Sequence, residues 1–219
     1  MSRFLFICKM LFVVLIVLFF CLPVTQISQA QSDIPEKASS DFDKTIEKLS
    51  KEGVISGDGS TTYYGDYTDE WAQIGWYQWL NFENANRFVF AANVTWNSAS
   101  DKPNNFESGC GIIFNNSGSE NHLIASLRMD GFVYFTGFRS NRYLSYGNYR
   151  FGKGLINGSA DFVLVVDNDK ATVYVDGNRI VRKADLPVMG DNVGLVTLSG
   201  TNRDYGTRCK WKDIFFYTW

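Results

Sequence analysis

The stretch that decides the fold runs from Phe162 to Lys183 and reads FVLVVDNDKATVYVDGNRIVRK. Two turn signals, Asn168-Asp169 and Asp176-Gly177, divide it into three runs rich in β-branched residues. An Asp-Gly pair between such runs favours a two-residue hairpin, because a type I′ turn needs positive φ at both central positions. The stretch therefore predicts consecutive antiparallel strands.

Side-chain alternation predicts where these strands lie. The first run is apolar on both faces, with Phe162, Leu164 and Val166 on one side and Val163 and Val165 on the other. The second run has a single apolar face, formed by Ala171, Val173 and Val175. We expect the first strand to lie inside a sandwich of two sheets and the second to keep a mixed outer face.

The first thirty residues are typical of a secretory signal peptide. Arg3 and Lys9 precede an unbroken apolar run from Met10 to Leu22, and Ser28-Gln29-Ala30 offers small residues at the two positions that a signal peptidase reads. The apolar run is shorter than the ~20 residues that span a bilayer. We expect cleavage after Ala30 and an extracytoplasmic product, secreted or at the cell surface, with no membrane span. A retained anchor is the alternative.

Residues 31–40 are polar and contain Pro35, which predicts a linker. Residues 41–56 predict a short helix and its connection, with Phe42, Ile46 and Leu49 on one face and Gly53 as the stop signal. A helix this short is not stable alone, so its apolar stripe should dock on the domain that follows. Residues 57–219 are expected to form the β-sandwich, beginning with a loop over 57–69.

Charge excludes several partners. The whole chain carries 21 basic and 23 acidic side chains, and removal of Arg3 and Lys9 leaves 19 against 23, a net charge of −4. A mildly acidic domain has no electrostatic footprint for nucleic acid or for anionic lipid.

Two of the four cysteines, Cys8 and Cys21, lie in the predicted signal peptide. Cys110 and Cys209 remain, and a pair of cysteines in an exported chain predicts a disulfide. Two buried free thiols are the alternative.

The last segment, CKWKDIFFYTW, carries an irregular spacing. Trp211, Ile214 and Phe216 are separated by three residues and then by two, which breaks strand alternation. A β-bulge at Lys212-Asp213 would return all three to one face. Asp130-Gly131 predicts a second hairpin of the same type as Asp176-Gly177.

Four segments in this order resemble a known family: NRFVFAANVTW (86–96), SGCGIIFN (108–115), VLVVDNDKATVYVDGNRIV (163–181) and CKWKDIFFYTW (209–219). The order resembles the concanavalin A-like lectin/glucanase superfamily, which includes laminin-G-like and 3-keto-disaccharide hydrolase-type domains. The resemblance spans Trp71 to Trp219. It implies an all-β, two-sheet antiparallel jelly-roll sandwich with neighbouring first and last core strands, and a carbohydrate or peptide site on the concave face or its rim.

The glucanase branch of this superfamily uses an E-x-D-x-x-E strand, because glycoside hydrolysis needs two carboxyl groups about 5 Å apart when configuration is retained. No E-x-D-x-x-E element occurs in the sequence. His122 is the only histidine, so a Ser-His-Asp site has a single candidate for its histidine. The acidic loops at 58–59, 66–70 and 167–169 match no complete calcium loop. We expect no catalytic residues and no metal, with calcium as an open alternative.

Aromatic and basic residues interleave shortly before the opening stretch. Sugar rings stack their C–H faces on aromatic side chains, and Arg can satisfy their hydroxyls. The predicted ligand-binding residues are Arg139, Arg142, Tyr143, Tyr146, Tyr149, Trp76 and His122. For Trp76 taken alone, core packing is the favoured interpretation, and core packing is also the alternative for the run 139–150. A structural hydrogen bond is the alternative for His122. The resulting hypothesis is a non-catalytic carbohydrate-binding module, against a glycan-active hydrolase or a structural, protein-interaction domain.

Overall fold

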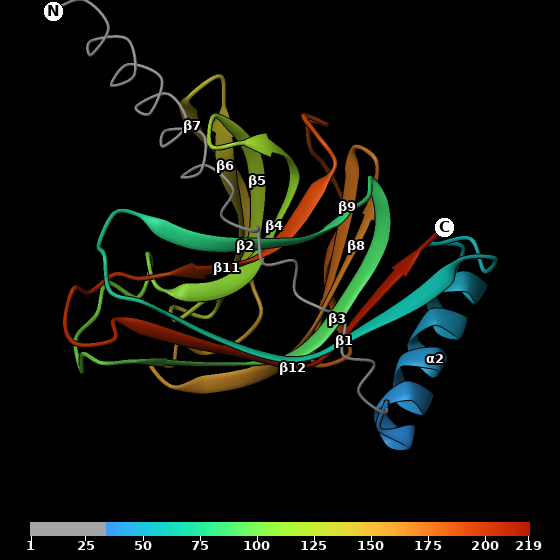
Figure 1. Ribbon diagram of the computed structural model, residues 1–219, viewed down its shortest axis with the longest axis horizontal. Coiled ribbons are helices and arrows are strands. Elements are labelled where there is room, and N and C mark those ends of the chain that lie inside the picture. The colour runs from blue at the N-terminus through green and yellow to red at the C-terminus, as the bar shows by residue number, and fades with distance from the viewer. Residues whose placement is uncertain (1–33) are drawn as a thin grey trace, which may run out of the picture. The chain divides into compact units, whose positions relative to one another are not determined.

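The structure is a computed structural model that describes residues 34–219 (Figure 1). The predicted signal peptide, residues 1–30, lies outside this range, as does the start of the predicted linker. Within the described range, one helix precedes twelve strands. No helix in that part of the chain is long and apolar enough to cross a membrane.

The twelve strands form two antiparallel sheets, which confirms the predicted all-β jelly-roll sandwich. In spatial order, sheet 1 contains β1 (Ser60–Trp71), β12 (Thr207–Thr218), β3 (Arg87–Ser98), β8 (Gly158–Asp167), β9 (Lys170–Val175) and β10 (Asn178–Asp185). Sheet 2 contains β2 (Tyr77–Asn84), β11 (Asn192–Leu198), β4 (Gly109–Gly118), β5 (Asn121–Arg128), β6 (Phe132–Arg139) and β7 (Arg142–Arg150). The final strand, β12, pairs with both β1 and β3, so the ends of the domain close on each other as the resemblance implied.

The opening stretch forms β8, β9 and β10 of sheet 1. Asp176 and Gly177 have φ values of 49° and 74°, as a type I′ turn requires. The alternation of β8 is as predicted: Phe162 points into the space between the sheets, while Val165 packs on the opposite face of sheet 1. Tyr174, expected on a mixed outer face, is buried there as well.

The second predicted hairpin joins β5 and β6, but its turn is of another type. Only Gly131 has a positive φ, at 87°, and the strand bounds leave a three-residue loop between Arg128 and Phe132. Asp130 holds this loop instead, because its carboxylate accepts a hydrogen bond from the Phe132 amide at 3.2 Å and one from the Tyr134 hydroxyl at 2.7 Å. The type I′ prediction is therefore wrong at this position.

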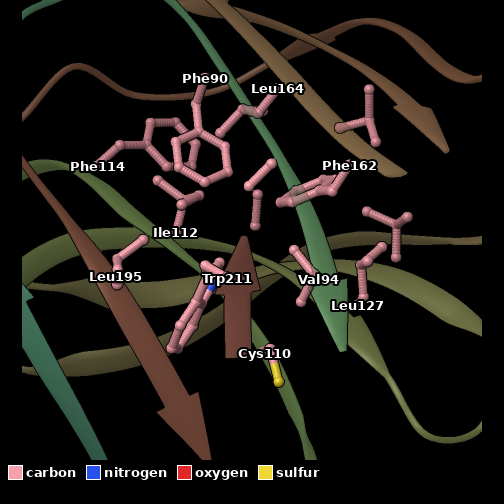
Figure 2. Close-up of a cluster of buried hydrophobic side chains, with 14 of the residues drawn as sticks. Phe90, Val94, Cys110, Ile112, Phe114, Leu127, Phe162, Leu164, Leu195 and Trp211 are labelled. Atoms are coloured by element: carbon pink, nitrogen blue, oxygen red, sulfur yellow. The ribbon is translucent and has the colours of Figure 1, made fainter. Parts of the chain in front are cut away.

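The main core fills the space between the two sheets (Figure 2). Phe90, Phe162 and Leu164 reach into it from sheet 1, and Ile112 and Phe114 reach into it from sheet 2. A disulfide between Cys110 on β4 and Cys209 on β12 links the sheets, with a Cα–Cα distance of 5.7 Å. The predicted disulfide is confirmed.

The predicted bulge in the last strand is also confirmed. The register between β12 and β3 is interrupted between Lys212 and Phe215, and Asp213 has a φ of 53°. The Asp213 amide donates a hydrogen bond to Asp66 Oδ1 at 2.9 Å, so this backbone N–H has a partner although the bulge interrupts the strand pairing. As a result, the three large apolar residues of the strand, Trp211, Ile214 and Phe216, all lie in the main core.

The N-terminal helix, α2 (Glu36–Lys51), begins earlier than predicted, so residues 36–40 are helical and are not linker. Pro35 precedes the first turn and lacks an N–H that would need a partner, and Glu36 favours the positive end of the helix dipole. The helix docks on the outer face of sheet 1 as expected (Figure 1). Phe42 stacks on Phe215 with ring centroids 4.6 Å apart.

Candidate functional site

The outer face of sheet 2 carries a pocket of about 240 Å³, which we call the sheet 2 pocket. Six of its lining residues are aromatic: Trp76, Tyr77, Phe106, Tyr134, Phe138 and Tyr143. The polar side chains that line it are Glu107, Arg128, Thr136 and Ser199. An aromatic cup with a few polar groups is typical of small-molecule sites.

Strand geometry explains how these residues meet. Tyr134, Thr136 and Phe138 are alternate residues of β6, so they share the outer face while Val133 and Phe135 enter the core. The pairing of β6 with β7 sets Tyr143 opposite Phe138, with ring centroids 5.6 Å apart.

Arg128, at the end of β5, provides the positive charge of the pocket. The residue is only 6% exposed. Its Nε donates to Ser126 Oγ at 2.7 Å, and Nη1 donates to the carbonyl of Phe106 at 3.1 Å. The guanidinium also lies 5.5 Å from the ring centroid of Tyr134. Burial lowers the pKa of Arg128, but a guanidinium stays charged in proteins.

His122 lies behind the pocket wall and does not line the pocket. It is 1% exposed and sits among the rings of Tyr77, Trp79 and Phe138. The Tyr77 hydroxyl is hydrogen-bonded to Nε2, and Nδ1 bonds the Gly118 carbonyl at 3.2 Å. A carbonyl can only accept, so Nδ1 carries the proton and Nε2 accepts from Tyr77 in the neutral imidazole. His122 thus holds Tyr77 in place.

Acidification is expected to destabilise the protein through His122. Burial lowers the pKa of His122 below its usual value of 6.5. Between that lowered pKa and about 6.5, the unfolded chain binds a proton that the native state does not, so stability is full above this window and falls as pH decreases through it. Urea unfolding at several pH values between 7.5 and 5 measures the loss. His122 is the only histidine, so H122Q should have a flatter profile, and an unchanged slope would contradict the assignment.

The structure separates the other six sequence-predicted residues into three pairs: one lines the pocket, one is exposed outside it, and one packs against the core. Trp76 and Tyr143 line the pocket and are 68% and 57% exposed, so core packing is the wrong interpretation of Trp76. Arg139 and Arg142 are exposed at the β6–β7 turn and are not among the lining residues.

Tyr146 and Tyr149 do not share the pocket face of β7. Both pack against the main core, and Tyr149 meets Phe135 with ring centroids 6.3 Å apart. Tyr146, three residues from Tyr143, falls on the opposite face by strand alternation, and the register shift between Phe135 and Thr136 moves Tyr149 to that face as well. The aromatic and basic run is therefore not a single binding surface.

Sequence reasoning missed Tyr77, Phe106, Arg128, Tyr134, Thr136 and Phe138. A signal for part of this set exists in the alternation of FVYFTGF, where Tyr134 and Phe138 fall on the side opposite to the core residues. No local signal marks Phe106, because it comes from a loop that reaches the pocket only in the folded chain.

Within residues 34–219, no three His, Cys, Asp or Glu side chains are grouped so that they could hold a metal ion. Several of the acidic loop residues have structural partners. Asp66 accepts the Asp213 amide in the β12 bulge, and Asp167 pairs with Arg87 at 3.0 Å.

No protein-family model matches the sequence, and no curated protein matches it. Solved structures do match. The carbohydrate-binding module CBM66 from Bacillus subtilis is similar with a TM-score of 0.52 at 12% identity, over 70% of this chain and 92% of that one. The structure of A. japonicus CB05 is similar with a TM-score of 0.50 at 14% identity. That match covers 77% of this chain and 27% of the other chain. At such identities the likeness establishes the fold: a jelly-roll sandwich of the lectin-like, concanavalin A-like kind.

Proposed function

We propose that this protein is an exported, non-catalytic carbohydrate-binding module and that the sheet 2 pocket is its site. The observation that carries the proposal is the pocket itself, in which six aromatic side chains surround a buried guanidinium and a carboxylate. Aromatic faces stack on the C–H faces of a sugar ring, while Arg128 can donate to its oxygens and Glu107 can accept from its hydroxyls.

Two further observations support this function. The name of CBM66 states that this similar structure binds carbohydrate. Disulfides persist in oxidising compartments outside the cytoplasm. The buried Cys110–Cys209 disulfide therefore supports a ligand at or outside the cell surface.

A glycan-active hydrolase of the same fold is the second candidate. Hydrolysis needs two carboxyl groups, about 5 Å apart for retention or about 6.5–9.5 Å apart for inversion. Among residues 34–219, Glu107 is the only carboxylate that lines the sheet 2 pocket. This favours binding over cleavage, and turnover of glycosides that is lost on a Glu107→Gln change would favour the hydrolase instead.

The rim aromatics are expected to supply much of the sugar affinity. Trp76→Ala and Tyr143→Ala should each weaken binding by about three- to tenfold, because an aromatic contact contributes about 0.5–1.5 kcal/mol beyond its buried area. Isothermal titration calorimetry with the strongest ligand from a glycan array measures the change. Leu155→Ala is the matched control, since Leu155 is an exposed apolar residue outside the pocket.

Full affinity in both aromatic variants would place the site elsewhere. A blank array, together with recovery of a specific protein partner, would favour a protein-interaction domain.

A further inference from the structure

Arg128 forms no ion pair among the described residues, although the charges of Asp130 and Glu107 favour its cation from farther away. No carboxylate oxygen of residues 34–219 lies within 4.0 Å of its nitrogens. The two acidic groups whose charge acts on Arg128 bond elsewhere: Asp130 accepts from Tyr134 and Phe132, and Glu107 accepts from Asn104 Nδ2 at 2.9 Å.

A largely desolvated charge without an ion-pair partner is costly in a protein interior. Ser126, the Phe106 carbonyl and the Tyr134 ring offset part of that cost, but none of them is an anion. The hydrogen bonds of the described residues leave Nη2 of Arg128 without an acceptor. Because Arg128 lines the pocket, a bound ligand can accept a hydrogen bond from Nη2.

We propose that the sheet 2 pocket takes an acidic sugar, a uronic acid whose carboxylate pairs with Arg128. The inference rests on the proposed carbohydrate-binding function and adds the chemical class of the ligand. A planar carboxylate matches the guanidinium fork and forms charge-assisted hydrogen bonds, which are roughly twice as strong as neutral ones.

Size and charge restrict the ligand further. A volume of about 240 Å³ is below the ~300–1,000 Å³ of sites for drug-sized ligands, so the pocket suits one sugar unit. Glu107 also lines it, and a second anionic group beside this carboxylate would be repelled. The pocket therefore suits a single carboxylate and disfavours a densely charged polyanion.

The ligand-side experiment uses the unaltered protein and four matched sugars: a uronic acid, its methyl ester, the neutral hexose and the hexose 6-sulfate. Calorimetry should show the acid binding at least about tenfold more tightly than the ester and the neutral hexose, because only the acid forms the charge-assisted pair. The preference should shrink as salt is raised.

Equal affinity for the acid, the ester and the neutral hexose would overturn the acidic-sugar inference and leave the carbohydrate function intact. Preference for the sulfate over the carboxylate would overturn the choice of anion. Failure of all four sugars, with a blank array, would overturn the proposed function as well.

Substitutions of Arg128 test whether this residue causes the preference for the acidic sugar. Arg128→Met should abolish the preference for the acid over its ester, and Arg128→Lys should keep part of it, because lysine retains the charge but not the fork. Arg142→Met is the matched control, since Arg142 is exposed near the pocket but does not line it. If Arg128→Met does not fold, the comparison of the uronic acid with its methyl ester on the unaltered protein still tests the inference. A preference retained in folded Arg128→Met would contradict the assignment.

Discussion

Replacing both Cys110 and Cys209 by alanine is expected to lower the free energy of unfolding by about 4 kcal/mol. The bridge joins residues 99 positions apart, and the chain-entropy model gives about 4.7 kcal/mol for a loop of about 100 residues. The two cysteines lie in the fully buried centre and tie β4 of sheet 2 to β12 of sheet 1. Urea unfolding of the double variant, beside the oxidised unaltered protein, measures the difference.

Removing the sulfur atoms also leaves small cavities, so a second measurement separates the crosslink from packing. The unaltered protein, reduced in urea and refolded with reductant present, keeps both side chains and loses only the bond. It should show most of the same loss. A difference below about 1 kcal/mol in both measurements would contradict a major role of the crosslink in stability.

Phe42→Ala is expected to destabilise the protein by about 3 kcal/mol. Phe42 is buried and stacks on Phe215, and truncation of a buried phenylalanine costs about 3–5 kcal/mol. Since α2 is too short to be stable alone, we also expect it to lose helicity or detach. Urea unfolding measures the free energy, and far-ultraviolet circular dichroism follows the helix.

Asp43→Ala is the matched control, because Asp43 is exposed on the same helix and should change stability by less than about 0.5 kcal/mol. If Phe42→Ala behaved like this control, α2 would not be docked on sheet 1 in solution.

The parts of the fold that could be predicted from sequence are those where local pattern and burial agree. Residues 162–166 are all apolar, and this predicts a strand that is covered on both faces. Phe162 and Val165 do lie on opposite, buried faces of sheet 1. The β12 bulge could be predicted for the same reason: only an extra residue at Lys212-Asp213 allows Trp211 and Ile214 to share the core.

Strand β1 (Ser60–Trp71) was expected to be largely a loop, because it has no apolar alternation and contains Gly65 and several acidic residues. It is a strand because β12 supplies its hydrogen-bond partners, with register shifts on both sides of Gly65. A strand held by an edge pairing rather than by an apolar face gives little signal in its own sequence.

The candidate site was predicted only in part. Trp76 and Tyr143 line the pocket, and Tyr146 lies on the opposite face of its strand by simple alternation. A register shift between β6 and β7, which no local pattern announces, puts Tyr149 on that opposite face too. Arg128 was missed because an arginine at the end of a strand usually reaches solvent, and it is buried here by the Phe106 loop and by Tyr134.

The claim that sugar binds in the sheet 2 pocket can be tested directly through the six tryptophans. Each indole N–H gives its own signal in a two-dimensional ¹H–¹⁵N NMR spectrum, which can be followed while the strongest glycan ligand is added. We predict that the Trp76 signal shifts most, since Trp76 lines the pocket. The signals of Trp211, buried in the main core, and of Trp96, bonded to the Leu155 carbonyl, should stay in place. Saturable binding that leaves Trp76 unchanged and shifts tryptophans remote from the pocket would contradict the account.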